Sequence, residues 1–236
     1  MPTARPDAGT IKTPMPQMAR VWDLPVRLFH WTLVILIVVS VTTGKIGGNW
    51  LAWHFYSGYL ILALVLFRIV WGLIGSDTAR FAGFVRGPSQ IFAYARSMLG
   101  GPPQFHAGHN PLGGLMVVLM LILLLTQATT GLFVDDEIAT RGPLADKVAD
   151  ATVALMTRIH RININVLLVC VGVHIAAALF YLLVKKDNLI VPMFTGTKAL
   201  PAGHPEPALR NSVIGFVVAA IALGFVIWLV KVYGKG

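Results

Sequence analysis

The sequence predicts an all-α integral membrane protein, with a four-helix transmembrane bundle followed by a fifth, C-terminal transmembrane helix. The 236 residues are 56% hydrophobic and only 12% charged, with a mean hydropathy of +0.73, whereas soluble domains carry about 25% charged residues. Five apolar runs of roughly 20 residues are each long enough to span a bilayer. They are continuously apolar instead of alternating with period two, which disfavours a β-barrel. The runs cover residues 24–43, 50–74, 111–133, 162–184 and 212–231.

The chain before the first run predicts a disordered cytoplasmic tail over residues 1–20. This segment holds four prolines and has no aliphatic stretch typical of a cleaved signal peptide. The first helix is expected to start near Asp23, a good N-cap, because Pro25 is tolerated in an opening turn. The glycine-rich segment 43–49 predicts a turn, and the tryptophans at 50 and 53 indicate an aromatic belt at the far interface.

Later boundaries follow from turn and capping residues. The second helix is expected to end around residues 72–75, and a basic linker over 76–110 includes a candidate interfacial helix at 88–99. Asn110 followed by Pro111 predicts the start of the third helix. We expect the bundle domain to cover residues 21–198, with a linker at 199–211 and the additional helix with its short tail at 212–236.

The charge distribution predicts the orientation of the chain. A net charge of +9 would suggest a nucleic-acid partner for a soluble protein, but here the charges lie at helix ends, so no nucleic acid is expected. Eleven Lys and Arg residues fall on the side of the N-terminus and seven on the other side. The positive-inside rule therefore predicts a cytoplasmic N-terminus and a periplasmic C-terminus.

Four histidines form the most informative pattern. His160 and His174 are fourteen residues apart in the fourth run, which places them on nearly the same helix face and ~21 Å apart along its axis. His30 lies in the same half of the membrane as His174, and His54 begins the second helix on the same side as His160. Topology thus predicts two pairs at two depths, His30 with His174 and His54 with His160.

Paired histidines within lipid are typical of haem ligation. A single histidine in a membrane helix is more often a packing or proton-relay residue, but four at matched depths favour two stacked haem b groups. Two imidazoles make the iron six-coordinate, which indicates electron transfer instead of substrate activation. The lone Cys170 and the absence of a CxxCH motif exclude a c-type haem within this sequence.

Several stretches of the sequence resemble the bacterial cytochrome b561 and nickel-iron hydrogenase cytochrome b family. The resemblance covers about residues 20–198 and also includes His160. It is carried by residues 21–31 (VWDLPVRLFHW), 53–59 (WHFYSGY), 67–72 (FRIVWG), 80–88 (RFAGFVRGP), 108–113 (GHNPLG) and 173–177 (VHIAA).

This resemblance implies a dihaem four-helix core in the bacterial inner membrane. It implies the same four histidines, His30, His54, His160 and His174, as axial ligands. It also implies electron transfer between the quinone pool and a peripheral redox partner such as a hydrogenase, a c-type cytochrome or another dehydrogenase.

Three further features each allow more than one interpretation. Arg68, in the second helix, either snorkels to the interface or pairs with a haem propionate. His109 contacts a propionate or a quinone, or serves the loop before the third helix. The fifth helix has no ionisable residue before Lys231, and its small residues indicate close packing, within this chain or in a homodimer seam.

Two other function classes remain open at this stage. The first is a haem oxidoreductase that reduces superoxide, oxygen or a ferric acceptor directly. The second is a redox-silent anchor or transporter whose histidines relay protons or bind a metal ion.

Overall fold

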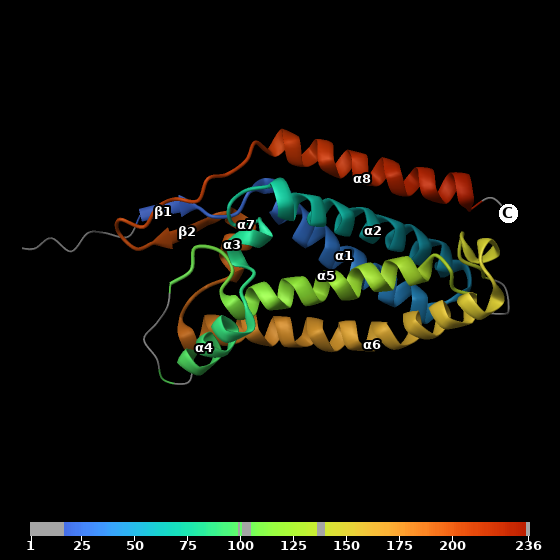
Figure 1. Ribbon diagram of the computed structural model, residues 1–236, viewed down its shortest axis with the longest axis horizontal. Coiled ribbons are helices and arrows are strands. Elements are labelled where there is room, and N and C mark those ends of the chain that lie inside the picture. Colours follow the sequence, from blue (N-terminus) through green and yellow to red (C-terminus); the bar gives the residue numbers. More distant parts are fainter. Residues whose placement is uncertain (1–16, 99, 101–104, 136–139, 235–236) are drawn as a thin grey trace, which may run out of the picture.

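Five long helices dominate the computed structural model, which describes residues 17–98, 100, 105–135 and 140–234 (Figure 1). All five are long and apolar enough to cross a membrane. This confirms the predicted all-α membrane class. The helices are α1 (Leu24–Ile46), α2 (Leu51–Ile74), α5 (Pro111–Gly131), α6 (Asp150–Phe180) and α8 (Ser212–Tyr233).

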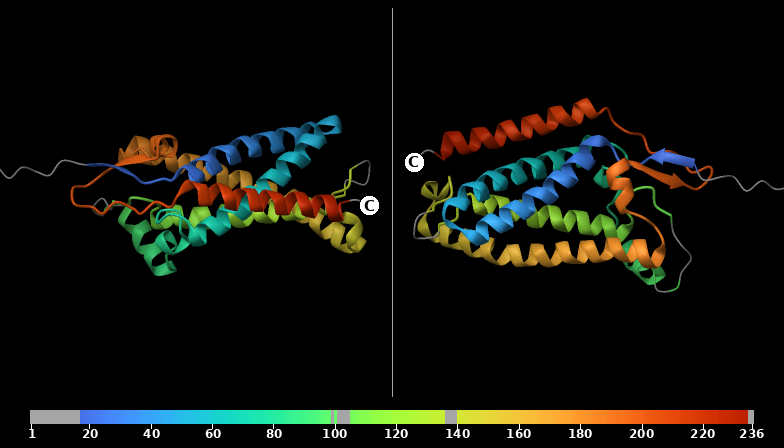
Figure 2. Two further views of the ribbon diagram at one scale, coloured as in Figure 1. Left: turned by 90° about the horizontal axis from the view of Figure 1, so that it is seen from above. Right: turned by 180° about the vertical axis from the view of Figure 1, so that it is seen from behind.

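The first four long helices pack in the order in which they occur along the chain. α1 contacts α2, α2 contacts α5, and α5 contacts α6, while α8 lies along α2 at the edge opposite α6 (Figures 1 and 2). A Cβ atom on Gly215 of α8 would lie only 2.5 Å from Cγ of Pro25. Glycine thus allows α8 to pack within this chain, one of the two alternatives left by the sequence.

Two predicted helix starts are confirmed by their capping hydrogen bonds. An Asp23 carboxylate oxygen accepts from the Val26 amide at 2.8 Å, with Pro25 in the first turn. The Asn110 side-chain oxygen likewise accepts from the Gly113 amide at 2.8 Å. The predicted linker helix is also present as α4 (Pro88–Met98), preceded by the single turn α3 (Phe81–Phe84).

The structure differs from expectation at the start of α6 and at the N-terminal segment. α6 begins at Asp150, twelve residues before the predicted apolar run. Its first turns are helical but carry polar and charged side chains, so a search for apolar residues misses them. Residues 17–20, expected in the disordered tail, form β1 (Gln17–Arg20), antiparallel to β2 (Thr197–Leu200). The buried side chains of Ala19 and Leu200 explain this pairing. Residues 1–16 lie outside the described part of the chain.

The bundle has two different ends. The sheet end holds β1, β2, α3, α4 and α7 (Ile190–Thr195), together with the π-helical turn η3 (Tyr181–Lys185) that finishes α6. The hairpin end holds the short α1–α2 connection with η1 (Gly48–Trp50) and the longer α5–α6 connection with η2 (Ala145–Lys147) (Figures 1 and 2).

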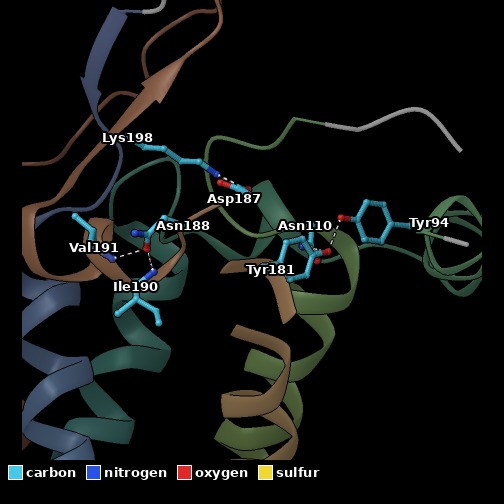
Figure 3. A network of polar contacts seen from close by, with 8 residues as sticks. All are labelled: Tyr94, Asn110, Tyr181, Asp187, Asn188, Ile190, Val191 and Lys198. Atoms are coloured by element: carbon cyan, nitrogen blue, oxygen red, sulfur yellow. Dashed lines mark hydrogen bonds and ion pairs between the residues drawn. The ribbon is translucent and has the colours of Figure 1, made fainter. Parts of the chain in front are cut away.

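Polar contacts fix the elements of the sheet end to one another (Figure 3). The hydroxyls of Tyr94 in α4 and Tyr181 in η3 are 2.8 Å apart, and the Asn110 amide donates to the Tyr181 hydroxyl at 2.9 Å. Burial, together with the Tyr181 contact, raises the pKa of Tyr94. Lys198 of β2 pairs with Asp187 at 3.0 Å. These contacts connect the end of α6 to α4, to α5 and, through β2, to the N-terminal strand.

Candidate functional site

The four predicted histidines come together in two pairs, one toward each end of the bundle. The sheet-end pair is His30 of α1 with His174 of α6, whose ring centroids are 6.4 Å apart. The hairpin-end pair is His54 of α2 with His160 of α6, at 6.2 Å. The structure therefore places each histidine beside the partner that topology predicts.

The spacing within each pair suits two rings that bind one metal ion between them. An imidazole nitrogen lies about 2 Å from a metal that it binds, so two such rings have centroids roughly 6 Å apart. No group of three or more His, Cys, Asp or Glu side chains able to hold a metal occurs among the described residues. Two protein ligands suit a haem, whose porphyrin supplies the other four, better than a structural zinc ion with four protein ligands.

Both rings of the hairpin-end pair are oriented by backbone carbonyls. Nδ1 of His54 lies 2.8 Å from the carbonyl oxygen of Ser40, and Nδ1 of His160 lies 2.9 Å from that of Gln127. Because a carbonyl oxygen only accepts, each Nδ1 must carry the hydrogen. The lone pair of each ring is consequently on Nε2, the nitrogen available to a metal.

The sheet-end pair has different surroundings. Nδ1 of His30 is buried and has no hydrogen-bond partner among the described residues. The neighbouring Trp31 packs its edge against the His30 ring, with centroids 4.9 Å apart, and stacks on Phe194 of α7 at 4.1 Å. The Trp31 indole also donates to the Met193 carbonyl at 3.1 Å. α7 thus holds the side chain that packs against the His30 ring.

Arg68 of α2 is a buried cation at the sheet end. It is only 3% exposed, and its Nη1 has no hydrogen-bond partner in the described part of the chain. The guanidinium carbon lies 5.3 Å from the centre of the Phe81 ring and 6.0 Å from that of Phe84. The position is too deep in the protein for snorkelling to account for it, since a snorkelling side chain keeps its charged head in water.

The carboxylate of Asp23, which attracts Arg68 electrostatically, is already hydrogen-bonded elsewhere. One oxygen caps α1 through Val26, and the other accepts from the Trp71 indole at 3.0 Å. Asp23 is 3% exposed and Trp71 is fully buried. Sequence reasoning found the cap but missed the bond to Trp71, which joins residues 48 positions apart and has no local signal.

His109 lies in the same part of the protein. Its ring packs against Trp22 and Phe84, with centroids 4.8 and 4.6 Å away, and its buried Nδ1 has no partner among the described residues. Burial first, and then the positive charge of Arg68, lower the pKa of His109 to about 3. At neutral pH the ring is therefore uncharged, and Arg68 provides the positive charge.

The unpartnered groups at the sheet end indicate that this region accommodates an additional acceptor. Arg68 Nη1 is a buried donor without a partner among the described residues, which costs about 1–3 kcal/mol. One ring nitrogen each of His30 and His109 also lacks a partner in that part of the chain, and the tautomer decides whether it is a donor or an acceptor. A carboxylate satisfies a buried guanidinium in both charge and geometry. The residues present therefore fit a haem, whose propionates would compensate the charge of Arg68.

The chain is similar to known proteins over most of its length. Residues 21–196 match the family model described as prokaryotic cytochrome b561. A protein named probable Ni/Fe-hydrogenase B-type cytochrome subunit from Azotobacter vinelandii is 26% identical, covering 79% of this chain and 90% of its own length. Proteins of the same name from Rhizobium leguminosarum bv. viciae (26%; 83% and 95% covered) and Cupriavidus necator (24%; 75% and 85%) are also similar. No solved structure matches the chain significantly.

Proposed function

The chain belongs to the prokaryotic cytochrome b561 family and is a membrane b-type cytochrome of electron transfer, and from this premise we propose that it is a dihaem relay. It passes electrons between the quinone pool and a peripheral redox partner. The observation that carries the proposal is the presence of two histidine pairs, 6.4 and 6.2 Å between centroids, at two depths of one bundle.

The four histidines act as axial ligands in this proposal. His30 with His174, and His54 with His160, each present two imidazoles to one haem b. When bound, haem b supplies an iron that alternates between ferric and ferrous states and so carries one electron. Because two histidines would hold each haem, substrates would be kept from its iron, which favours a relay over direct chemistry.

Arg68 and His109 bind the cofactor at the sheet end. The buried guanidinium of Arg68 compensates a propionate charge, and this explains why its Nη1 has no other partner in the described residues. The neutral ring of His109 offers a hydrogen bond without adding positive charge, since its pKa is about 3. Both residues then have roles that their burial otherwise leaves unexplained.

A hydrogenase is the partner that the comparisons favour. The similar proteins from Azotobacter and Rhizobium are named hydrogenase B-type cytochrome subunits, and a c-type cytochrome or another dehydrogenase is the alternative. We place the chain in the bacterial inner membrane with the sheet end cytoplasmic and the C-terminus periplasmic, following the distribution of Lys and Arg.

Stopped-flow oxidation of the reduced, detergent-solubilised protein tests the relay. A short-chain quinone should oxidise it rapidly, and a quinone-site inhibitor should slow that reaction selectively. Oxygen, superoxide and a ferric chelate should react slowly and without response to the inhibitor. Fast oxidation by one of these acceptors, with no effect of quinone, would instead support a directly reactive haem oxidoreductase.

A further inference from the structure

Two five-residue segments with the same ending, Thr-Thr-Gly, lie near the end of α1 and at the end of α5. Residues 40–44 read SVTTG and residues 127–131 read QATTG. In both helices the pattern lies at the hairpin end, just before the chain turns toward the next long helix. The next long helix after each copy, α2 or α6, carries one histidine of the hairpin-end pair.

The two copies make the same carbonyl contact with the two rings, whereas the hydroxyl 3.3 Å from each Nδ1 belongs to Ser40 in the first copy and to Thr130 in the second. The carbonyl of the first residue, Ser40 or Gln127, accepts from Nδ1 of the histidine at 2.8 or 2.9 Å. The second threonine of each copy, Thr43 or Thr130, donates to the carbonyl one turn earlier, at 2.7 or 2.6 Å. This hydroxyl also lies 3.3 or 3.2 Å from the carbonyl that accepts from the ring.

The glycine of each copy provides the space for the ring. A Cβ on Gly44 would lie 2.7 Å from His54 Nδ1, and a Cβ on Gly131 would lie 3.0 Å from His160 Cε1. Real Cβ atoms essentially never approach as closely as the first distance. An added Cβ at Gly44 would displace the His54 ring from the carbonyl four residues earlier, and an added Cβ at Gly131 would push the His160 ring by a few tenths of an ångström.

We propose that these two segments are paired histidine seats, which hold His54 and His160 symmetrically with Nδ1 bonded to the backbone and Nε2 directed to the shared site. Their residues are positioning residues, since they act through the two histidines. The sheet-end pair is held differently, because Nδ1 of His30 has no such partner in the described chain.

The seats have an electronic consequence for the hairpin-end centre. A hydrogen bond from Nδ1 to a carbonyl makes Nε2 a stronger electron-pair donor to a metal. Stronger donation stabilises the ferric state, so it lowers the midpoint potential. At the sheet end the buried charge of Arg68 acts in the opposite direction, because a nearby cation favours the reduced state. The hairpin-end centre is therefore the one of lower potential.

This inference rests on the proposed dihaem function, and a redox titration of purified glycine variants tests it. Gly44→Ala and Gly131→Ala should each raise the midpoint potential of one and the same spectral component, the lower one, with the other unchanged. Gly172→Ala is the matched control, because it lies on α6 where an added Cβ meets nothing within 4 Å. Haem content by pyridine haemochrome is measured on every preparation.

The outcomes separate the inference from the proposed function. Gly44→Ala could lose that component altogether, because its clash is the more severe. Gly131→Ala is the milder change, and it supports the proposal if it keeps the component at a raised midpoint potential. The proposed role of the two segments would be contradicted by any of three results. These are shifts of different components in the two variants, equal shifts of both components, or no shift at all. A wild-type protein that binds no haem would instead defeat the proposed function.

Discussion

The two histidine pairs differ in whether the protein itself supplies hydrogen-bond partners for the buried nitrogens around them. At the hairpin end, Nδ1 of both rings is bonded to a backbone carbonyl of the protein itself. At the sheet end, His30, His109 and Arg68 each retain a buried nitrogen without a partner in the described residues. At the hairpin end the helices themselves satisfy both Nδ1 atoms, whereas at the sheet end the proposed haem would supply the acceptor that Arg68 lacks among the described residues.

The largest expected effect comes from removing a ligand of either pair. His54→Ala and His160→Ala should each eliminate the same spectral component, and His30→Ala and His174→Ala the other, since one imidazole cannot hold a six-coordinate haem. Each variant should retain about half of the haem. Spectra of the purified proteins, reduced minus oxidised, measure this. The control is His204→Ala, in the loop between β2 and α8, which should match wild type. If His30→Ala and His54→Ala lost the same spectral component, the assignment of the histidines to pairs would be wrong.

Arg68→Gln should have a smaller effect that is confined to the sheet end. Losing a hydrogen bond to a charged group costs roughly 1.5–3 kcal/mol, so the sheet-end haem should bind more weakly and its midpoint potential should fall. Arg68→Lys keeps the charge but not the planar guanidinium, so its haem binding and midpoint potential should lie between those of wild type and Arg68→Gln. A redox titration with haem quantification gives both values. A shift of the hairpin-end component instead would contradict the assigned position of the propionates.

The smallest effect is expected from the contact of α8 with the sheet end. Gly215→Ala forces a Cβ against Pro25 and should lower stability by about 1–3 kcal/mol, as overpacking does. Thermal unfolding measures the loss. Gly224→Ala, on the same helix with open space around it, should be neutral or slightly stabilising. Both variants should keep both haem components. Loss of the sheet-end component in Gly215→Ala would show that α8 supports a histidine pair.

Much of the fold and of the candidate site could be predicted because the signals are local. Apolar runs of bilayer length located the five helices, and Asp23 and Asn110 marked two helix starts by their capping chemistry. The histidine pairs followed from helix periodicity and the alternating direction of successive spans.

The remaining features depend on contacts that no local pattern encodes. The β1–β2 pairing joins residues about 180 positions apart, and Trp71 meets Asp23 only after α1 and α2 have packed. The polar start of α6 has low hydropathy although it is helical. Ser40 and Gln127 act through backbone carbonyls, which every residue possesses, so only the repeated Thr-Thr-Gly sequence could have pointed to them.

The most direct test of the central claim is the amount of haem b bound per chain. Pyridine haemochrome absorbance of the purified protein, divided by the protein concentration from amino-acid analysis, gives this ratio. Two histidine pairs predict two haems per chain, from cells supplied with ample porphyrin precursor. A ratio of one, or a colourless protein, would contradict the account.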